Sequence, residues 1–125
     1  MNNIFDSAYE GNLPMLRQLV GDGAGINVRD SEGMTALMWA SEGGRTQVVQ
    51  FLLEHGADVN ATDDDNWTAL LHAAQVNAVE TAEELLKHGA DARIMNKLGW
   101  DFSRIAHRNQ NKQLISLIER PDLRL

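Results

Sequence analysis

The amino-acid sequence predicts an all-α solenoid in which four helix-turn-helix units stack side by side. The first reason is a period of 33 residues, because the segment from Asp30 to Thr62 aligns with the segment from Asp63 to Met95 at 11 identical positions. Average amino-acid usage would give about two identities over that length. The second reason is that each period contains two short apolar patterns with helical spacing. The third is that the rest of each period is short and rich in turn residues.

The same period extends, in weaker form, to both ends of the chain. The segment "GAGIN" from Gly23 corresponds to "GADVN" from Gly56, and Trp100 corresponds to Trp67. We therefore expect a single domain over residues 1–125, with units at about 1–29, 30–62, 63–95 and 96–125. The first and last units are expected to be caps, because the ends of a solenoid must present a polar outer face.

The first helix of a unit is indicated by apolar and small residues that share one side of a short helix. In the second unit these are Leu37, Met38, Ala40 and Ser41. Thr35 stands at the expected start of this helix, and two glycines follow its expected end.

The second helix of the unit is indicated by Val48, Val49, Leu52 and Leu53, whose spacing places them in one stripe facing the first helix. Gly56 follows, where a helix commonly ends in a left-handed residue. A pair of helices this short is marginal alone and needs neighbouring pairs to cover its flanks. We expect truncation of Leu52, Leu53, Leu85 or Leu86 to alanine to cost about 2 to 5 kcal/mol.

The outer helix of the third unit has weaker packing residues than its counterpart. Thr81, Ala82 and Glu84 stand where the second unit has valine, valine and phenylalanine. We therefore predict that the third unit is locally the least stable.

The rest of each period predicts an extended loop that folds back in a tight turn. Gly33, Asn66 and Gly99 occupy the position in this turn that most needs a positive φ. Asp30 and Asp63 precede the turn at equivalent places, and we expect their carboxylates to accept backbone N–H groups.

The segment "GMTALMWASEGGRTQVVQFLLEHGADVNATD" resembles an ankyrin repeat, and the 33-residue period is that of this family. The resemblance implies helix, turn, helix and then a projecting β-hairpin-like finger, with the units stacked in a slightly curved solenoid. The chain departs from the family pattern at Thr35-Ala36-Leu37-Met38, where Thr-Pro-Leu-His is usual. His72 lies one place later than the family histidine, and we expect it to face solvent.

Composition narrows the classes of partner and cofactor. Asp and Glu number 18 against 11 Lys and Arg, giving a net charge of -7, which disfavours nucleic acid and anionic membranes and favours a basic protein partner. The chain has no cysteine for disulfides or Cys-based zinc sites. We expect no cofactor and a monomer. No secretory leader or membrane-spanning stretch is evident, so the cytoplasm is the expected location.

Two groups of residues allow a metal site or a structural role. His55 and His88 recur at equivalent places, but stacked helices about 8 to 10 Å apart are too distant for a shared zinc. We expect each to cap its own helix end. The run Asp63 to Asp65 lacks the alternating ligands of a calcium loop. Asp64 and Asp65 are therefore expected to be solvated at the finger tip.

No set of residues resembling a nucleophile, base and carboxylate arrangement is evident, so we predict a non-catalytic protein–protein interaction module. Two alternatives are a stoichiometric inhibitor or immunity-type protein that neutralises a basic enzyme or toxin, and, more remotely, a metal-dependent hydrolase using His72 with Asp63 to Asp65. Trp67 and Trp100 share one position and either pack locally or form exposed anchors, with Met34 continuing the row.

The resemblance also implies which positions face a partner, namely the finger tips and the inner helices. The residues at these positions are Arg29, Ser31, Glu32, Met34, Glu42, Asp64, Asp65, Trp67, Gln75, Val76, Lys97, Leu98, Trp100 and Arg108.

Overall fold

A computed structural model describes residues 3–123, and these residues form eight α-helices and one 3-10 helix. No β-strand occurs within residues 3–123. The helices are α1 (Ile4–Glu10), α2 (Leu13–Gly21), α3 (Ala36–Glu42), α4 (Thr46–Glu54), α5 (Ala69–Gln75), α6 (Val79–Lys87), α7 (Phe102–Arg108), α8 (Lys112–Ile118) and the 3-10 helix η1 (Pro121–Leu123). The outermost residues of the two predicted caps, 1–2 and 124–125, lie outside the described residues.

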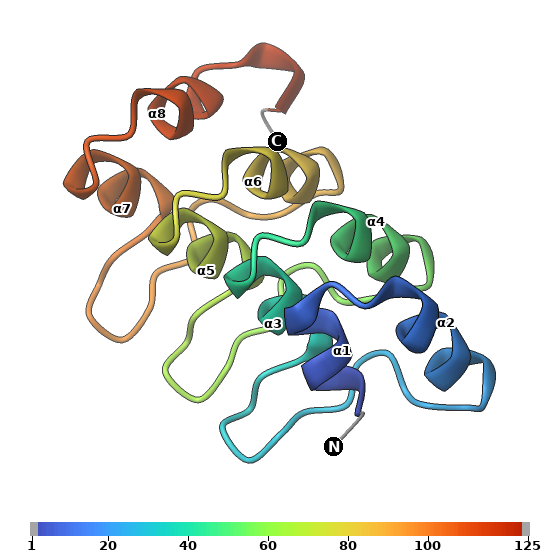
Figure 1. Ribbon diagram of the computed structural model, residues 1–125. Coiled ribbons are helices and arrows are strands. Elements are labelled where there is room, and N and C mark those ends of the chain that lie inside the picture. The colour runs from blue at the N-terminus through green and yellow to red at the C-terminus, as the bar shows by residue number, and fades with distance from the viewer. Residues whose placement is uncertain (1–2, 124–125) are drawn as a thin grey trace.

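The helices form two parallel rows, as Figure 1 shows. Helices α1, α3, α5 and α7 make the inner row, and α2, α4, α6 and α8 make the outer row. The loops that join successive pairs project on the side of the inner row. The all-α repeat solenoid predicted from the 33-residue period is therefore confirmed.

The inner helices begin at side chains that accept the first free backbone N–H groups. Thr35 Oγ1 accepts from the N–H of Met38 at 3.3 Å, and Thr68 Oγ1 accepts from the N–H of Leu71 at 3.2 Å. Such caps satisfy donors that have no partner within the helix. The predicted core face of α3 is confirmed, because every one of its predicted residues is buried.

The outer helices bury the predicted stripe with one exception. Val48, Val49 and Leu52 are buried, but Leu53 is only partly covered. Because part of the surface of Leu53 already faces water, we expect its truncation to cost less than that of the fully buried Leu52. The hydroxyl of Thr81 on α6 lies 2.9 Å from that of Thr46 on α4, so the buried Thr81 has a polar partner in the preceding unit.

The ends of the middle outer helices confirm the predicted caps. Gly56 has a φ of 90° and follows α4, where a residue with a β-carbon would be strained. His55 Nδ1 lies 2.8 Å from the carbonyl oxygen of Phe51, and His88 Nδ1 lies 3.0 Å from that of Glu84. Each histidine therefore binds its own helix end.

An asparagine from each of the first two units ties the following unit in register. Asn27 accepts from the N–H of Asp58 at 2.8 Å and donates to the carbonyl of Gly56 at 3.1 Å. Asn60 makes the same pair of contacts one unit later, at 2.8 and 3.2 Å. The same residue type recurs at this position because its side-chain amide makes the hydrogen bonds between neighbouring units.

The projecting loops are hairpin-like, and we call them the first finger (30–34), the second finger (63–67) and the third finger (96–100). Gly33, Asn66 and Gly99 have φ values of 77°, 64° and 80°, which confirms the predicted turn. The fingers are also bonded to one another. The N–H of Asp64 donates to the carbonyl of Glu32 at 3.1 Å, and that of Lys97 donates to the carbonyl of Asp65 at 3.0 Å.

Candidate partner-binding surface

Each of the first two fingers is built around one aspartate whose two oxygens have different roles. Oδ1 of Asp30 accepts from the N–H groups of Glu32 and Met34 at 2.9 and 3.0 Å. Oδ1 of Asp63 accepts in the same way from Asp65 and Trp67, both at 2.9 Å. The predicted role of these carboxylates in the turn is confirmed.

The second oxygen of each aspartate connects the finger to an inner helix. Oδ2 of Asp30 accepts from Nε1 of Trp39 at 2.9 Å, and Oδ2 of Asp63 lies 3.1 Å from Nε2 of His72. Burial raises the pKa of Asp30, but the hydrogen bonds from Trp39 and from the backbone lower it more, so the pKa lies below its ordinary value. The carboxylates therefore fix the fingers against α3 and α5.

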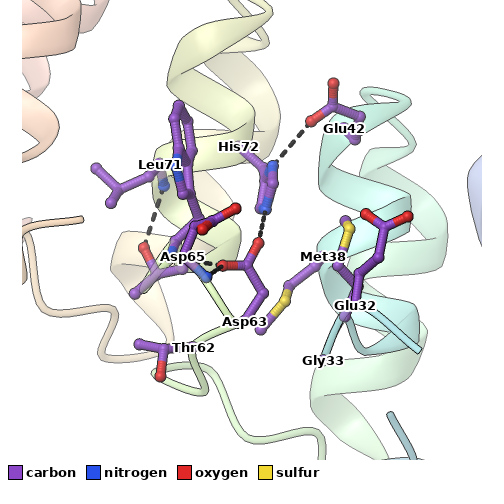
Figure 2. Close-up of polar contacts among 12 residues, drawn as sticks. Glu32, Gly33, Met38, Glu42, Thr62, Asp63, Asp65, Leu71 and His72 are labelled. Atoms are coloured by element: carbon purple, nitrogen blue, oxygen red, sulfur yellow. Dashed lines mark hydrogen bonds and ion pairs between the residues drawn. The ribbon is translucent and has the colours of Figure 1, made fainter. Parts of the chain in front are cut away.

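His72 does not face solvent, which corrects the expectation from the sequence. Figure 2 shows its ring between Glu42 and Asp63, and its side chain is only 12% exposed. Nδ1 lies 2.9 Å from Oε2 of Glu42, on the preceding inner helix. The cluster therefore links two units and one finger.

The row of three exposed apolar side chains does not form. Met34 is buried at 6% exposure, so it packs in the core and is not accessible to a partner. Trp67 is partly buried, and its ring lies 5.2 Å from that of His72 at an angle of 32°. Trp100 is also partly buried and lies beneath the guanidinium groups of Arg104 and Arg108, at 5.4 and 4.6 Å. Both tryptophans thus combine local packing with partial exposure.

The finger tips carry exposed carboxylates, as expected for Asp64 and Asp65. Glu32 on the first finger is exposed as well. None of these three side chains forms an ion pair with another residue in the range 3–123. Gly33 follows Glu32 with a φ of 77°, and a β-carbon there would lie 3.1 Å from the backbone nitrogen of Asp64.

The other positions predicted to face a partner are all at least partly exposed. Glu42 is partly exposed, and Arg29 is exposed, although its guanidinium also donates to the carbonyls of Gly33 and Thr62 and so braces the first finger. The other exposed positions are Ser31, Gln75, Val76, Lys97, Leu98 and Arg108. Of these, Leu98 is the most open apolar side chain, at 66% exposure.

Three further residues belong to this surface and were missed from the sequence. Tyr9 is 46% exposed and packs edge-on against Trp39, with ring centroids 5.8 Å apart. A shift of 33 residues from Glu42 leads to Tyr9, so the period itself could have found it. Arg104 is exposed beside Trp100, and Met95 is exposed immediately before the third finger. The residues 33 positions earlier do not indicate that either belongs to a binding surface.

Within residues 3–123 no set of three or more His, Asp and Glu side chains is placed to hold a metal ion. Ser41, next to Glu42 in the sequence, is fully buried. Its hydroxyl donates to the carbonyl of Leu37 at 2.8 Å, so it is not accessible at this surface. None of the helices in the described part of the chain is long and apolar enough to cross a bilayer.

Comparison with known proteins is consistent with this architecture. The chain is similar to osteoclast-stimulating factor 1 of Bos taurus, with 39% identity over 51 residues that make up 41% of this chain and 24% of the bovine protein. The Monopterus albus protein of the same name is 47% identical over 47 residues, 38% of this chain and 22% of that protein. The matched segments thus span about a quarter of these relatives.

The family comparison covers more of the chain than these relatives do. The family described as ankyrin repeats (3 copies) matches residues 4–96, which include the first two fingers and helices α1 to α6. Ankyrin repeats bind other proteins. On the evidence of the match and of the stacked helix pairs, the chain belongs to the ankyrin-repeat family.

Proposed function

We propose that the chain is a non-catalytic binding module that holds a basic partner protein through its finger tips and inner helices. One observation carries the proposal. Glu32, Asp64 and Asp65 stand exposed on two neighbouring fingers, and no cation within residues 3–123 neutralises them. A surface of this kind attracts and orients a partner that carries Lys or Arg.

The fingers are fixed before a partner arrives, which favours binding. Their aspartates are bonded to both the backbone and an inner helix, and neighbouring fingers share backbone hydrogen bonds. Ordering a loop on binding would cost free energy that a preformed loop does not lose. Trp67 adds a partly exposed aromatic side chain beside the acidic tips, and such residues are frequent anchors in interfaces.

The proposal is tested by reversing the charge of the second finger. We expect the double variant Asp64→Lys, Asp65→Lys to bind partners captured from the native source at least about tenfold more weakly, because two attractive contacts become repulsive. Affinity is measured by titration calorimetry with the purified partner. Trp67→Ala is expected to weaken binding as well, and circular dichroism checks that each variant keeps its helices.

A matched control makes the same change in net charge on the outer row. Glu54 and Glu119 are exposed at the ends of α4 and α8, away from the fingers. The double variant Glu54→Lys, Glu119→Lys should keep the wild-type affinity within about twofold, because net charge alone has a small, screened effect at physiological salt. Equal losses in both double variants would argue against a binding site at the finger tips.

A further inference from the structure

The inner helices change charge in order along the stack. Glu42, Gln75 and Arg108 occupy the same place at intervals of 33 residues, on α3, α5 and α7. All three are accessible, Glu42 partly so. At this position of the repeat, the side-chain charge therefore changes from negative to neutral to positive along the stack.

The finger tips change charge in the same direction. Two neighbouring positions of each finger tip are exposed in all three fingers. The first position holds Ser31, Asp64 and Lys97, and the second holds Glu32, Asp65 and Leu98. The first two fingers therefore carry carboxylates, whereas the third carries an ammonium group and an apolar side chain. The row on the helices and the row on the loops thus both carry carboxylates in the earlier units and a cation in the last one.

The third finger and α7 hold a surplus of donors and cations. Arg104 and Arg108 both lie against the ring of Trp100, and neither forms an ion pair within residues 3–123. A guanidinium group that lies over an aromatic ring can still donate its N–H groups to an acceptor. Lys97 adds a third cation at the adjacent finger tip.

An unpaired buried amide marks the same unit. Asn96 is 5% exposed and replaces the aspartate of the first two fingers, and its Oδ1 accepts from the N–H groups of Leu98 and Trp100. Its Nδ2 has no hydrogen-bond partner in the described part of the chain. The place of Trp39 and His72 is taken by Ile105, which offers no polar atom. Unlike the first two fingers, the third finger therefore has no polar side-chain partner at this place on its inner helix.

The distance between the two charged ends sets the length of a matching ligand. Neighbouring units in a stack lie about 8 to 10 Å apart, so the acidic tip of the first finger and the cations of the third finger and α7, two units further on, are separated by roughly 16 to 20 Å. An extended peptide rises about 3.3 Å per residue. Five or six residues of extended chain span the interval.

We propose that this surface binds an extended peptide segment of its partner that carries basic residues at one end and acidic residues at the other, about five or six residues apart. The basic end contacts the tips of the first two fingers, and the acidic end contacts Lys97, Arg104 and Arg108. The inference rests on the proposed function and adds the chemical pattern of the partner. It also reconciles a chain of net charge -7 with a cationic patch on its binding face.

The inference is tested with synthetic peptides of defined charge, titrated into the full chain at low ionic strength and followed by fluorescence anisotropy. The bipolar peptide has two lysines, five uncharged residues and two glutamates. The two half-charged peptides replace either the glutamates or the lysines by glutamine. The bipolar peptide is expected to bind at least about threefold more tightly than either, because it makes ion pairs at both ends. Shortening the spacer to one residue is expected to remove this gain.

Variants of the protein separate the two ends. Arg104→Glu with Arg108→Glu is expected to remove the gain of the bipolar peptide while leaving binding of the lysine-only peptide unchanged. The matched control is Lys87→Glu with Lys112→Glu, which alters two exposed cations of the outer helices by the same charge and should keep the gain. Thermal unfolding confirms that all variants are folded.

The outcomes distinguish the two proposals. Equal affinity for the bipolar and lysine-only peptides, or no binding of any peptide, would overturn the bipolar pattern. If the lysine-only peptide then still binds more weakly to the variant Asp64→Lys, Asp65→Lys than to the wild type, the proposed function stands without the bipolar pattern. Tightest binding of the glutamate-only peptide would contradict both, because the acidic tips would then play no part.

Discussion

At the scale of single residues, the aspartate at the start of a finger explains most of the local order. Asp30 serves the turn with one oxygen and α3 with the other. Asparagine can replace only the first of these functions, since its second polar atom is a donor. Asn96 illustrates the consequence, because its Nδ2 is left without a partner among the described residues.

We predict that Asp30→Asn lowers the free energy of unfolding at pH 7 by about 1 to 3 kcal/mol, because the amide faces the N–H of Trp39 with another donor. The pKa of Asp30 is lowered in the folded chain, so the carboxylate stabilises the fold above its unfolded pKa and loses this effect as the pH falls through the folded value. The free energy of unfolding, measured with urea at pH 7 and at pH 3, should therefore differ less between variant and wild type at pH 3.

The control for this prediction is Asp58→Asn. Asp58 is exposed, and its carboxylate accepts one backbone N–H, from Asn60, a bond that asparagine can keep. We expect a change within about 0.5 kcal/mol. A loss at Asp30 that is no larger than this, or that is the same at both pH values, would contradict the role assigned to its second oxygen.

At the scale of elements, α4 and α6 are equivalent helices with different cores. Phe51 on α4 is buried and lies on the ring of His55, with centroids 4.1 Å apart. The equivalent Glu84 on α6 places a carboxylate oxygen 3.6 Å from His88 instead. An aromatic pair stabilises a partly buried site more than a solvent-screened ion pair does.

We predict that the amides of α6 exchange with solvent faster than those of α4, because α6 buries less apolar surface. Glu84→Phe should restore the contact seen at Phe51 and raise the free energy of unfolding by about 0.5 to 1.5 kcal/mol. Hydrogen exchange followed by NMR measures both effects. Equal protection of the two helices, with no gain in the variant, would show that the third unit is not the weaker one.

At the scale of the whole molecule, each helix pair covers the apolar flank of the one before it. Phe102, Ile105 and Ala106 of α7 are fully buried against the rest of the stack, so the last unit is part of the core as well as of the binding face. Stability in such a stack is close to a sum of unit and neighbour terms. Removing an end unit therefore exposes the flank of the unit before it.

We predict that a chain ending at residue 95 unfolds at a markedly lower urea concentration than the full chain, because α5 and α6 lose the cover of α7 and α8. The control is a chain ending at residue 120, which loses η1 and the single buried side chain of Leu123. This shorter deletion should cost less. A chain ending at residue 95 with unchanged stability would mean that the last unit does not support its neighbour.

The sequence by itself determined the period, the helix pairs, the capping residues and the positive φ values of the turns. These features depend on local spacing and on backbone sterics, which are visible in one stretch of chain. It also located the finger tips, and so the acidic part of the candidate surface.

Only the tertiary structure decided which side chains of that surface are accessible and what they contact. Met34 is buried, Leu53 is partly open, His72 lies between two carboxylates, and Trp100 lies under two arginines. The physical reason is that burial of a repeated position depends on the neighbouring unit and on adjacent turns. Equivalent residues such as Met34 and Trp67 therefore meet different surroundings, which their shared place in the period does not reveal.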